Sequence, residues 1–308
     1  MHAVTDGAPR LTPVLTVLGL DGPPAGRPAY PGVAAALAAR LRADGASPLV
    51  TFYDDATGER VELSGITLDN WVAKTANLLV DTLGLAPGDR VGVDLPVHWL
   101  TVVILLAAWS AGCEVLVALG PEQEGGEQEG AAEDDPDDEA TGDVQALFVA
   151  ESRVDTALGL GADEVVALSL RPFGARMAHP VAGVLDFAAE VPAHGDRFAA
   201  PSPPADQAAL LARAGEVAAA AGIGAGDRLL STAGPASVEG LLGSVLAPLV
   251  AGASVVLCRH LDANLDDAAL ARRITQEKVT MVCGTDRSVP AGVRELRLPD
   301  AARPSPAD

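Results

Sequence analysis

Aromatic side chains and positive charge are both scarce in this sequence of 308 residues. Phe, Trp and Tyr together make up only 3% of it, which argues against a protein that stacks nucleic-acid bases on aromatic rings. The 42 acidic residues outnumber the 21 basic ones and give a net charge of −21. Nucleic acids and anionic membranes bind to basic surfaces. We therefore expect neither as a partner.

Cysteine is also rare, with three residues at Cys113, Cys258 and Cys283. They are far apart and each lies in an apolar stretch, which predicts buried, reduced thiols in a cytoplasmic protein and not a disulfide framework. The five histidines show no metal-ligand spacing. No metal site is expected.

No clean secretory signal opens the sequence, because Pro13 interrupts its first apolar run. Two longer uncharged stretches lie between Asp94 and Glu114 and between Glu239 and Arg259. Each approaches the length of a membrane span, but proline, glycine or polar residues interrupt both. We expect each to form a buried helix followed by a buried strand.

The composition divides the chain into five segments. Hydrophobic residues make up 49% of the sequence, and its length is typical of two domains. Residues 121–143 hold 11 acidic residues and no Lys or Arg, which predicts a disordered acidic loop. A first subdomain is expected over residues 31–120 and a second over 144–299. The Pro- and Gly-rich residues 1–30 are predicted to be a flexible leader and residues 300–308 a frayed tail.

One pattern occurs twice along the chain, over residues 67–119 and 207–258. Each copy reads as a helix, a Gly-Asp-Arg turn, a strand, an apolar helix, an Ala-Gly pair and a second strand. A strand–helix–strand crossover places parallel strands side by side. The repeat therefore predicts an α/β fold with two related subdomains, each containing a mainly parallel sheet.

The remaining patterns predict further elements. We expect a helix over 31–42, a hairpin of strands 49–53 and 60–63, a strand–helix–strand unit within 146–170, and a helix and strand over 266–277 and 279–283. Asp89 and Asp227 precede strands and are interpreted as turn caps, and His98 as a helix-start residue.

Weak candidates for cofactor binding lie where two predicted strands end. Ser231 and Thr232 end the strand 229–232, and Gly284 follows the strand 279–283. The carboxyl ends of parallel strands are where open α/β sheets bind ligands. Ordinary turn hydroxyls are the favoured interpretation of Ser231 and Thr232. No catalytic residue is assigned.

Two long blocks carry a family resemblance through their order and spacing. They are SGITLDNWVAKTANLLVDTLGLAPGDRVGVDLPVHWLTVVILLAAWSAGCEVL and GIGAGDRLLSTAGPASVEGLLGSVLAPLVAGASVVLCRH, the latter followed by EKVTMVCG. They resemble the large domain of the AMP-binding, acyl-adenylate-forming enzymes, which include the acyl-CoA synthetases. A group of uncharacterised bacterial proteins with the patterns VTFYDDATGERVELS and NWVAKTANLL is more similar still. The resemblance covers about residues 32–300 and implies the fold of a truncated large domain.

The resemblance also implies a chemistry that the residues do not support. Those enzymes join a carboxylate to ATP and need a Ser/Thr/Gly-rich phosphate loop ending in Lys-Gly, after a strand that DQAALL resembles. Here Ala212, Arg213, Ala214 and Gly215 follow instead, and the only lysines are Lys74 and Lys278. The family's following histidine, its Tyr-Gly-x-Thr-Glu motif, its ribose-binding aspartate and its C-terminal lysine have no match. No functional residue of the family is carried over.

Three functional hypotheses remain. The first is a degenerate, non-adenylating relative that acts as a binding or interaction protein and needs no cofactor. The second is a partner-dependent enzyme that retains binding of acyl-CoA or of a nucleotide such as ATP or AMP. The third is a fragment of an AMP-dependent synthetase. We also expect a homodimer or a complex with a protein partner, because strands near Leu229 and Val255 would lack cover.

Overall fold

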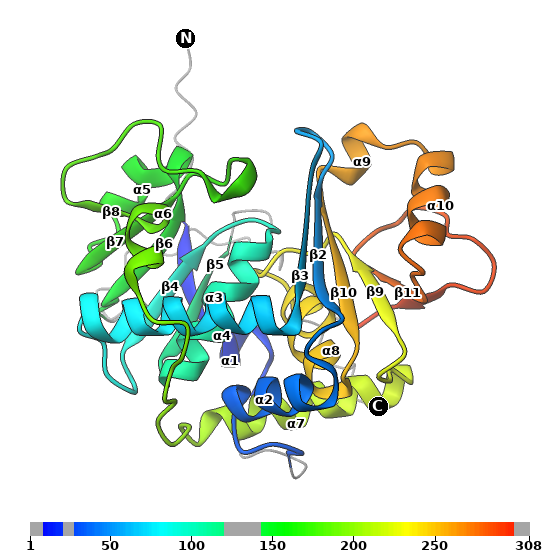
Figure 1. Ribbon diagram of the computed structural model, residues 1–308, viewed down its shortest axis with the longest axis horizontal. Coiled ribbons are helices and arrows are strands. Elements are labelled where there is room, and N and C mark those ends of the chain that lie inside the picture. The colour runs from blue at the N-terminus through cyan, green and yellow to red at the C-terminus, as the bar shows by residue number, and fades with distance from the viewer. Residues whose placement is uncertain (1–8, 21–27, 120–142, 299–308) are drawn as a thin grey trace, which may run out of the picture.

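A computed structural model describes residues 9–20, 28–119 and 143–298 of the chain (Figure 1). The predictions for residues 1–8, for the acidic loop up to residue 142 and for the tail 300–308 lie outside the described residues. The strands form two six-stranded sheets, in the orders β1-β5-β4-β6-β7-β8 and β12-β11-β9-β10-β2-β3.

The first sheet consists of β1 (Arg10–Pro13), β5 (Glu114–Leu119), β4 (Arg90–Asp94), β6 (Ala146–Ala150), β7 (Glu164–Leu168) and β8 (Val184–Asp186). The second consists of β12 (Arg294–Leu296), β11 (Met281–Cys283), β9 (Arg228–Ser231), β10 (Ser254–Arg259), β2 (Pro48–Asp54) and β3 (Glu59–Ser64). Every pair of neighbours is parallel except β1 with β5 and β2 with β3. The predicted α/β fold with mainly parallel sheets is therefore confirmed.

The repeat in the sequence is a repeat in the structure. In the first copy α3 (Gly65–Asn77) precedes β4, α4 (Trp99–Ala111) and β5. In the second copy α7 (Asp206–Ala221) precedes β9 and β10. The turn before each first strand is also the same, because the backbone N–H of Ala86 donates to Asp89 at 2.7 Å and that of Gly224 donates to Asp227 at 2.8 Å. Both aspartates are turn caps, as expected.

The crossover of the second copy differs from the single α-helix that the pattern predicts. It is a π-helix, η6 (Glu239–Leu246), followed by the short helix α8 (Ala247–Ala251). Both crossovers are buried and each leads into a buried strand. Within the described chain, no helix has the length and apolar character to span a bilayer.

The predicted flexible leader is wrong for residues 9–20. Residues 10–13 form β1, which pairs antiparallel with β5, and the helix α1 (Val14–Val17) follows directly. Leu11 and Val14 are buried. This segment is ordered because it pairs with β5. The residues of the segment alone do not reveal that such a partner strand exists.

The two sheets do not follow the predicted ranges 31–120 and 144–299. The hairpin β2–β3 lies in the first range, yet β2 pairs with β10 of the second sheet. The strands β6, β7 and β8 lie in the second range, yet β6 pairs with β4 of the first sheet. Each sheet thus takes strands from both sides of the acidic segment, because backbone pairing between distant strands decides sheet membership.

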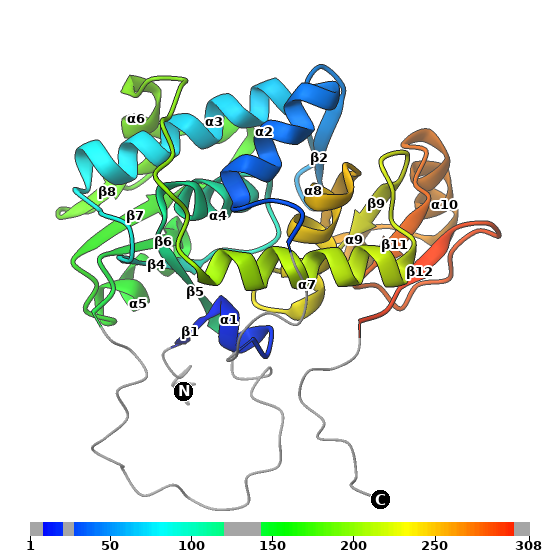
Figure 2. The same cartoon turned by 90° about the horizontal axis from the view of Figure 1, so that it is seen from below.

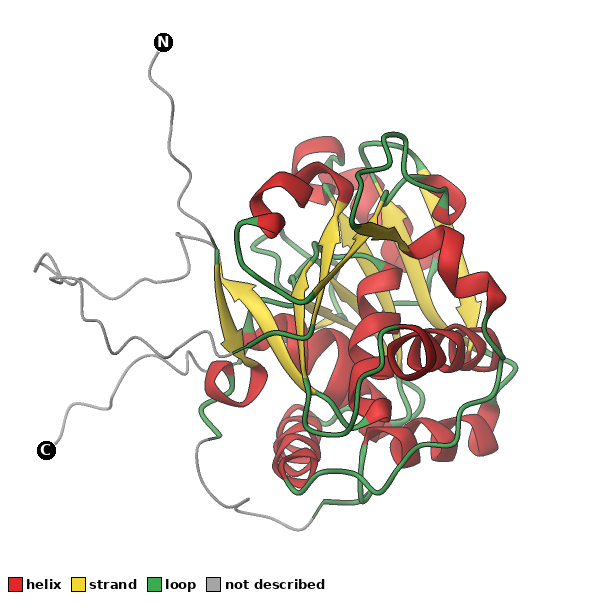
Figure 3. Cartoon of the chain, turned by 90° about the vertical axis from the view of Figure 1, so that its left-hand side faces the viewer, coloured by secondary structure: helices red, strands yellow, loops and turns green. Residues whose placement is uncertain are grey.

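Helices fill the space between the two sheets and cover their outer faces (Figures 1 and 3). Successive residues of a strand point to opposite faces, so Leu229 faces the central core while Leu230 faces the outer one. The central core holds the helices α2 (Val33–Asp44), α3, α4, α7, η6 and α8. The outer face of the first sheet packs on α5 (Val154–Leu158), and that of the second packs on α9 (Leu261–Asn264) and α10 (Asp267–Gln276).

The strands near Leu229 and Val255 were expected to lack cover, but helices pack on both faces of the second sheet. Leu229 is 0% exposed and Val255 4% exposed, so both are covered within one chain. The helix α7 runs across the molecule from beside β5 toward β12 (Figure 2), and its buried side chains pack on the central core. The three cysteines are free and buried, as expected, and burial raises the pKa of each thiol to about 12.

Candidate functional site

The three candidate residues come together where β9 and β11 end. The two strands are parallel neighbours with Ser231 opposite Cys283. The backbone N–H of Thr232 donates to the carbonyl of Cys283 at 3.2 Å, and the Thr232 hydroxyl donates to the carbonyl of Gly284. The two strands therefore end side by side at one edge of the second sheet.

The two hydroxyls are engaged inside the protein. Ser231 is 0% exposed, and its Oγ accepts hydrogen bonds from Ser244 Oγ at 2.7 Å and from the N–H of Ala233 at 3.1 Å. Thr232 closes the contact between the two strand ends through Gly284. These bonds favour a structural role for both side chains.

A cleft with a volume of about 630 Å³ opens just beyond these strand ends. Gly284 lines it, whereas Ser231 and Thr232 lie outside its wall. The wall comes from the loop after β9, the start of η6, the end of β11 and the strand β12 with the residues after it. Its residues are Ala233, Gly234, Ser237, Glu239, Val282, Cys283, Gly284, Thr285, Asp286, Glu295, Leu296, Arg297 and Leu298.

Glycine is required at two positions that shape this cleft. Gly284 has a φ of 72°, and a Cβ atom there would lie 2.7 Å from the Cβ of Ala233. A Cβ atom on Gly240 would lie 1.7 Å from the carbonyl oxygen of Gly234. Both distances are far below van der Waals contact, so the loop after β9 can approach β11 and η6 only because side chains are missing here.

The charged side chains of the cleft are mainly acidic. Glu239, Asp286 and Glu295 line it together with one cation, Arg297. Arg297 pairs with Glu295 at 2.7 Å, and this hydrogen bond raises the pKa of the guanidinium. Burial raises the pKa of Cys283, and the charge of Glu239 adds to that effect. Among the described residues, Glu239 and Asp286 have no side-chain hydrogen bond or ion pair.

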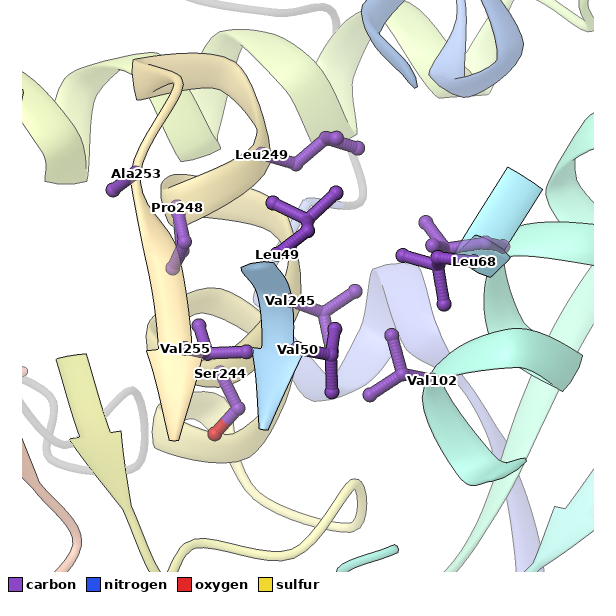
Figure 4. Close-up of a pocket in the computed structure, with 11 residues that line it drawn as sticks. Leu49, Val50, Leu68, Val102, Ser244, Val245, Pro248, Leu249, Ala253 and Val255 are labelled. Atoms are coloured by element: carbon purple, nitrogen blue, oxygen red, sulfur yellow. The ribbon is translucent and has the colours of Figure 1, made fainter. Parts of the chain in front are cut away.

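A much smaller cavity lies between the two halves of the molecule (Figure 4). It holds about 20 Å³, and ten of its eleven lining residues are apolar. Leu68 and Val102 approach it from one side and Leu49 and Leu249 from the other (Figure 4). The hydroxyl of Ser244, its one polar residue, already donates to Ser231. A space this small and apolar has room for about one water and few partners for it.

A pair that sequence reasoning missed lies at the carboxyl edge of the same sheet. His260 Nδ1 lies 2.8 Å from Asp54 Oδ1, and Asp54 also accepts the N–H of Ala56 at 3.0 Å. Burial raises the pKa of Asp54, but the hydrogen bonds from His260 and Ala56 outweigh it and the pKa is lowered. His260 has a φ of 58°, in the left-handed region. The signal was invisible in the sequence because it depends on the pairing of β2 with β10.

His98 acts as the expected helix-start residue. Its Nδ1 accepts the N–H of Leu100 at 3.1 Å at the start of α4, and its ring packs on Phe52 with 4.5 Å between centroids. Burial, helped by the charge of Arg259, lowers the pKa of His98 to about 3. The imidazole is therefore neutral at physiological pH.

Neither lysine lines the cleft. Lys74 Nζ donates to the carbonyl of His194, and Lys278 is exposed just after α10. The segment that resembles the family's strand before its phosphate loop, residues 206–211, is helical and belongs to α7. Across the described ranges, no group of three or more His, Cys, Asp or Glu side chains could hold a metal ion.

Comparison with known proteins gives relatives in both sequence and structure. No family model matches the chain. A TIGR03089 family protein of Mycobacterium tuberculosis is 41% identical over 248 residues, which span 79% of this chain and 93% of that protein.

Two solved structures show the same fold. One is the acyl-CoA synthetase of Brucella canis, with a TM-score of 0.61 and 18% identity over 87% of this chain. The other is the anthranilate CoA ligase AuaEII in complex with anthranoyl-AMP, with a TM-score of 0.57 and 15% identity over 83% of this chain. The match spans 50% of the length of each solved chain. The fold expected from the resemblance to adenylate-forming enzymes is confirmed.

Proposed function

Because the chain belongs to the TIGR03089 family and has the fold of the acyl-CoA synthetases, we propose that it is a non-adenylating relative that binds a ligand or partner. One observation carries the proposal. The residues expected to lead into a phosphate loop are instead the first turns of α7, which continues unbroken from Asp206 to Ala221.

The continuity of this helix matters for chemistry. A phosphate loop binds through backbone N–H groups that are free of other partners. Inside an α-helix each N–H bonds to the carbonyl four residues earlier, so it cannot also face a polyphosphate. Ala212, Ala214 and Gly215 provide no hydroxyl in the place of the loop, and the one cation there, Arg213, is on the helix. We infer that ATP is not activated at this position.

The cleft at the ends of β9 and β11 supports binding without adenylation. Its volume of about 630 Å³ lies within the range of small-molecule sites, about 300–1,000 Å³. Its place at the carboxyl edge of a parallel sheet is the usual one for ligands in open α/β folds. We propose this cleft, with Gly284 in its wall, as the ligand site.

We predict that the purified protein forms no acyl-adenylates. One missing oxyanion-type donor lowers a rate by about 10²–10³-fold, and the loss of a whole phosphate loop removes several. ATP–pyrophosphate exchange with a panel of carboxylates should therefore stay at the level of a no-enzyme control. Carboxylate-dependent exchange that survives repeated purification would contradict the proposal. A thermal-shift screen with ATP, AMP and CoA tests the partner-dependent enzyme separately, because that alternative requires at least one of them to stabilise the chain.

We also propose that the protein associates with a second chain, either its own copy or a different protein. The support is the outer edge of the second sheet at β12, which pairs with no further strand among the described residues, because an open strand edge offers unpaired N–H and C=O groups to another chain. The strand has only three residues, so we expect such pairing to be limited in length. Light scattering after size exclusion should then give a mass well above the 31.2 kDa of one chain. A monodisperse particle of one chain mass, unchanged by added salt, would contradict this proposal.

A further inference from the structure

We propose that the cleft at the ends of β9 and β11 selects a ligand carrying a cationic amine or guanidinium group, and rejects nucleotides and carboxylates. The inference rests on the proposed function, because it assumes that this cleft is the ligand site. It concerns the chemical class of the ligand, which follows from the charges on the wall and from the state of the backbone donors at the start of η6.

The wall carries three carboxylates and one cation, so its net charge is negative. Glu239 lies on η6, Asp286 on the loop after β11 and Glu295 on β12. Three separate segments of the chain therefore place acidic side chains around the same cleft. Arg297 is 82% exposed and its guanidinium lies 2.7 Å from Glu295. The charge of Asp286 also acts on Arg297, but less strongly than the hydrogen bond with Glu295. Among the described residues, neither Glu239 nor Asp286 forms an ion pair of its own, and a bound cation would supply one.

The start of η6 is poorly suited to binding an anion. A helix N-terminus normally attracts phosphate or carboxylate through its free N–H groups and its partial positive charge. Here Glu239 is the first residue of η6 and places its own negative charge at that end. The hydroxyl oxygen of Ser237 accepts the N–H of Gly240 at 3.0 Å, and the Ser237 carbonyl accepts that of Leu241 at 3.0 Å. These donors are therefore already used.

Contacts within the chain hold the wall of the cleft together. Gly284 lies close to Ala233, and the hydrogen bond from Thr232 to Gly284 joins the same two strand ends. Val282, Leu296 and Leu298 add apolar surface next to the acidic groups. The wall therefore suits a molecule with an apolar body and a cationic end. The net charge of −21 over the whole chain also disfavours the approach of anions.

The test compares cationic and anionic probes, among them the similarly shaped benzamidine and benzoate, by calorimetric titration of the full-length protein. Benzamidine and agmatine are the cationic probes, and benzoate and AMP are the anionic ones. We expect binding of at least one cationic probe and of neither anion. The double variant Glu239→Gln/Asp286→Asn should weaken that binding by about tenfold or more, with the melting temperature unchanged.

A matched variant separates a built site from general attraction to an acidic protein. Asp155→Asn/Glu164→Gln also removes two negative charges, but from exposed positions on α5 and β7, away from the cleft. It should bind the cationic probe as tightly as the unaltered chain. Equal weakening by both double variants, tighter binding of benzoate or AMP, or binding of no probe at all would each overturn the inference. The pyrophosphate-exchange assay judges the proposed function on its own, so the two can fail separately.

Discussion

Replacing Glu277 by glutamine is expected to lower the free energy of unfolding by about 3–5 kcal/mol, because it leaves a buried arginine without its counter-charge. The side chains of Glu277 and Arg228 are only 9% and 14% exposed, and their charged atoms are 2.6 Å apart. Glu277 also accepts hydrogen bonds from the Tyr53 hydroxyl at 2.5 Å and from Arg60 at 3.0 Å. The carboxylate thus ties the residue after α10 to β2, β3 and β9.

The same group predicts a dependence on pH. Burial raises the pKa of Glu277, but the hydrogen bonds from Tyr53, Arg228 and Arg60 outweigh it and lower the pKa from 4.5 to about 2. The unfolded chain therefore takes up this proton at a higher pH than the folded one. The stabilisation is complete above about pH 4.5 and is lost as the pH falls toward 2.

Urea unfolding of the unaltered protein and of Glu277→Gln, near neutral pH and at several acidic values, measures the loss of stability and its pH dependence. The difference in stability between the two proteins should shrink as the pH falls through that window. Glu62→Gln is the matched control, because Glu62 is 37% exposed and pairs with the half-exposed Arg60. This control substitution should lower the free energy of unfolding by less than about 1 kcal/mol. Equal effects of the two substitutions would mean that burial adds nothing to the role of Glu277.

Replacing Gly240 by alanine is expected to disrupt the second half of the molecule. The new Cβ would lie 1.7 Å from the carbonyl oxygen of Gly234 and 2.4 Å from its carbonyl carbon. Backbone atoms cannot rotate away as a flexible side chain can, so either η6 or the loop after β9 must move. We expect a loss of at least about 3 kcal/mol of stability and, because Gly234 lines the cleft, a loss of ligand binding.

Thermal unfolding followed by circular dichroism measures this effect. Gly215→Ala is the control, because nothing lies within 4 Å of the position of its new Cβ on α7. Alanine in an open helical position should raise stability by about 0.5–1 kcal/mol. If the two variants melt at the same temperature, the backbone around Gly234 can move without loss of stability, and the prediction is wrong.

Most of the local structure of this protein is predictable from its residues alone. The repeated strand–helix–strand units, the turn caps Asp89 and Asp227 and the helix-start residue His98 were predicted and are present. These features depend on neighbours within a few residues, where side-chain spacing and hydrogen bonding to the nearby backbone decide the conformation. The resemblance to adenylate-forming enzymes rests on the same order of elements, and for that reason it gave the correct fold.

Which elements meet became visible in the folded chain and not before. It assigned the hairpin β2–β3 to the second sheet and ordered residues 9–20 on the first. It placed Gly284 on the wall of a cleft whose acidic residues come from three elements. It also joined Asp54 to His260, and Tyr53 to Glu277 across 224 positions of sequence. These long-range contacts could not be predicted because a strand edge, or a buried charge, can pair with any partner of suitable geometry. Hydrophobic spacing shows which face of an element is buried, whereas the packing of the whole chain selects the residue that lies against it.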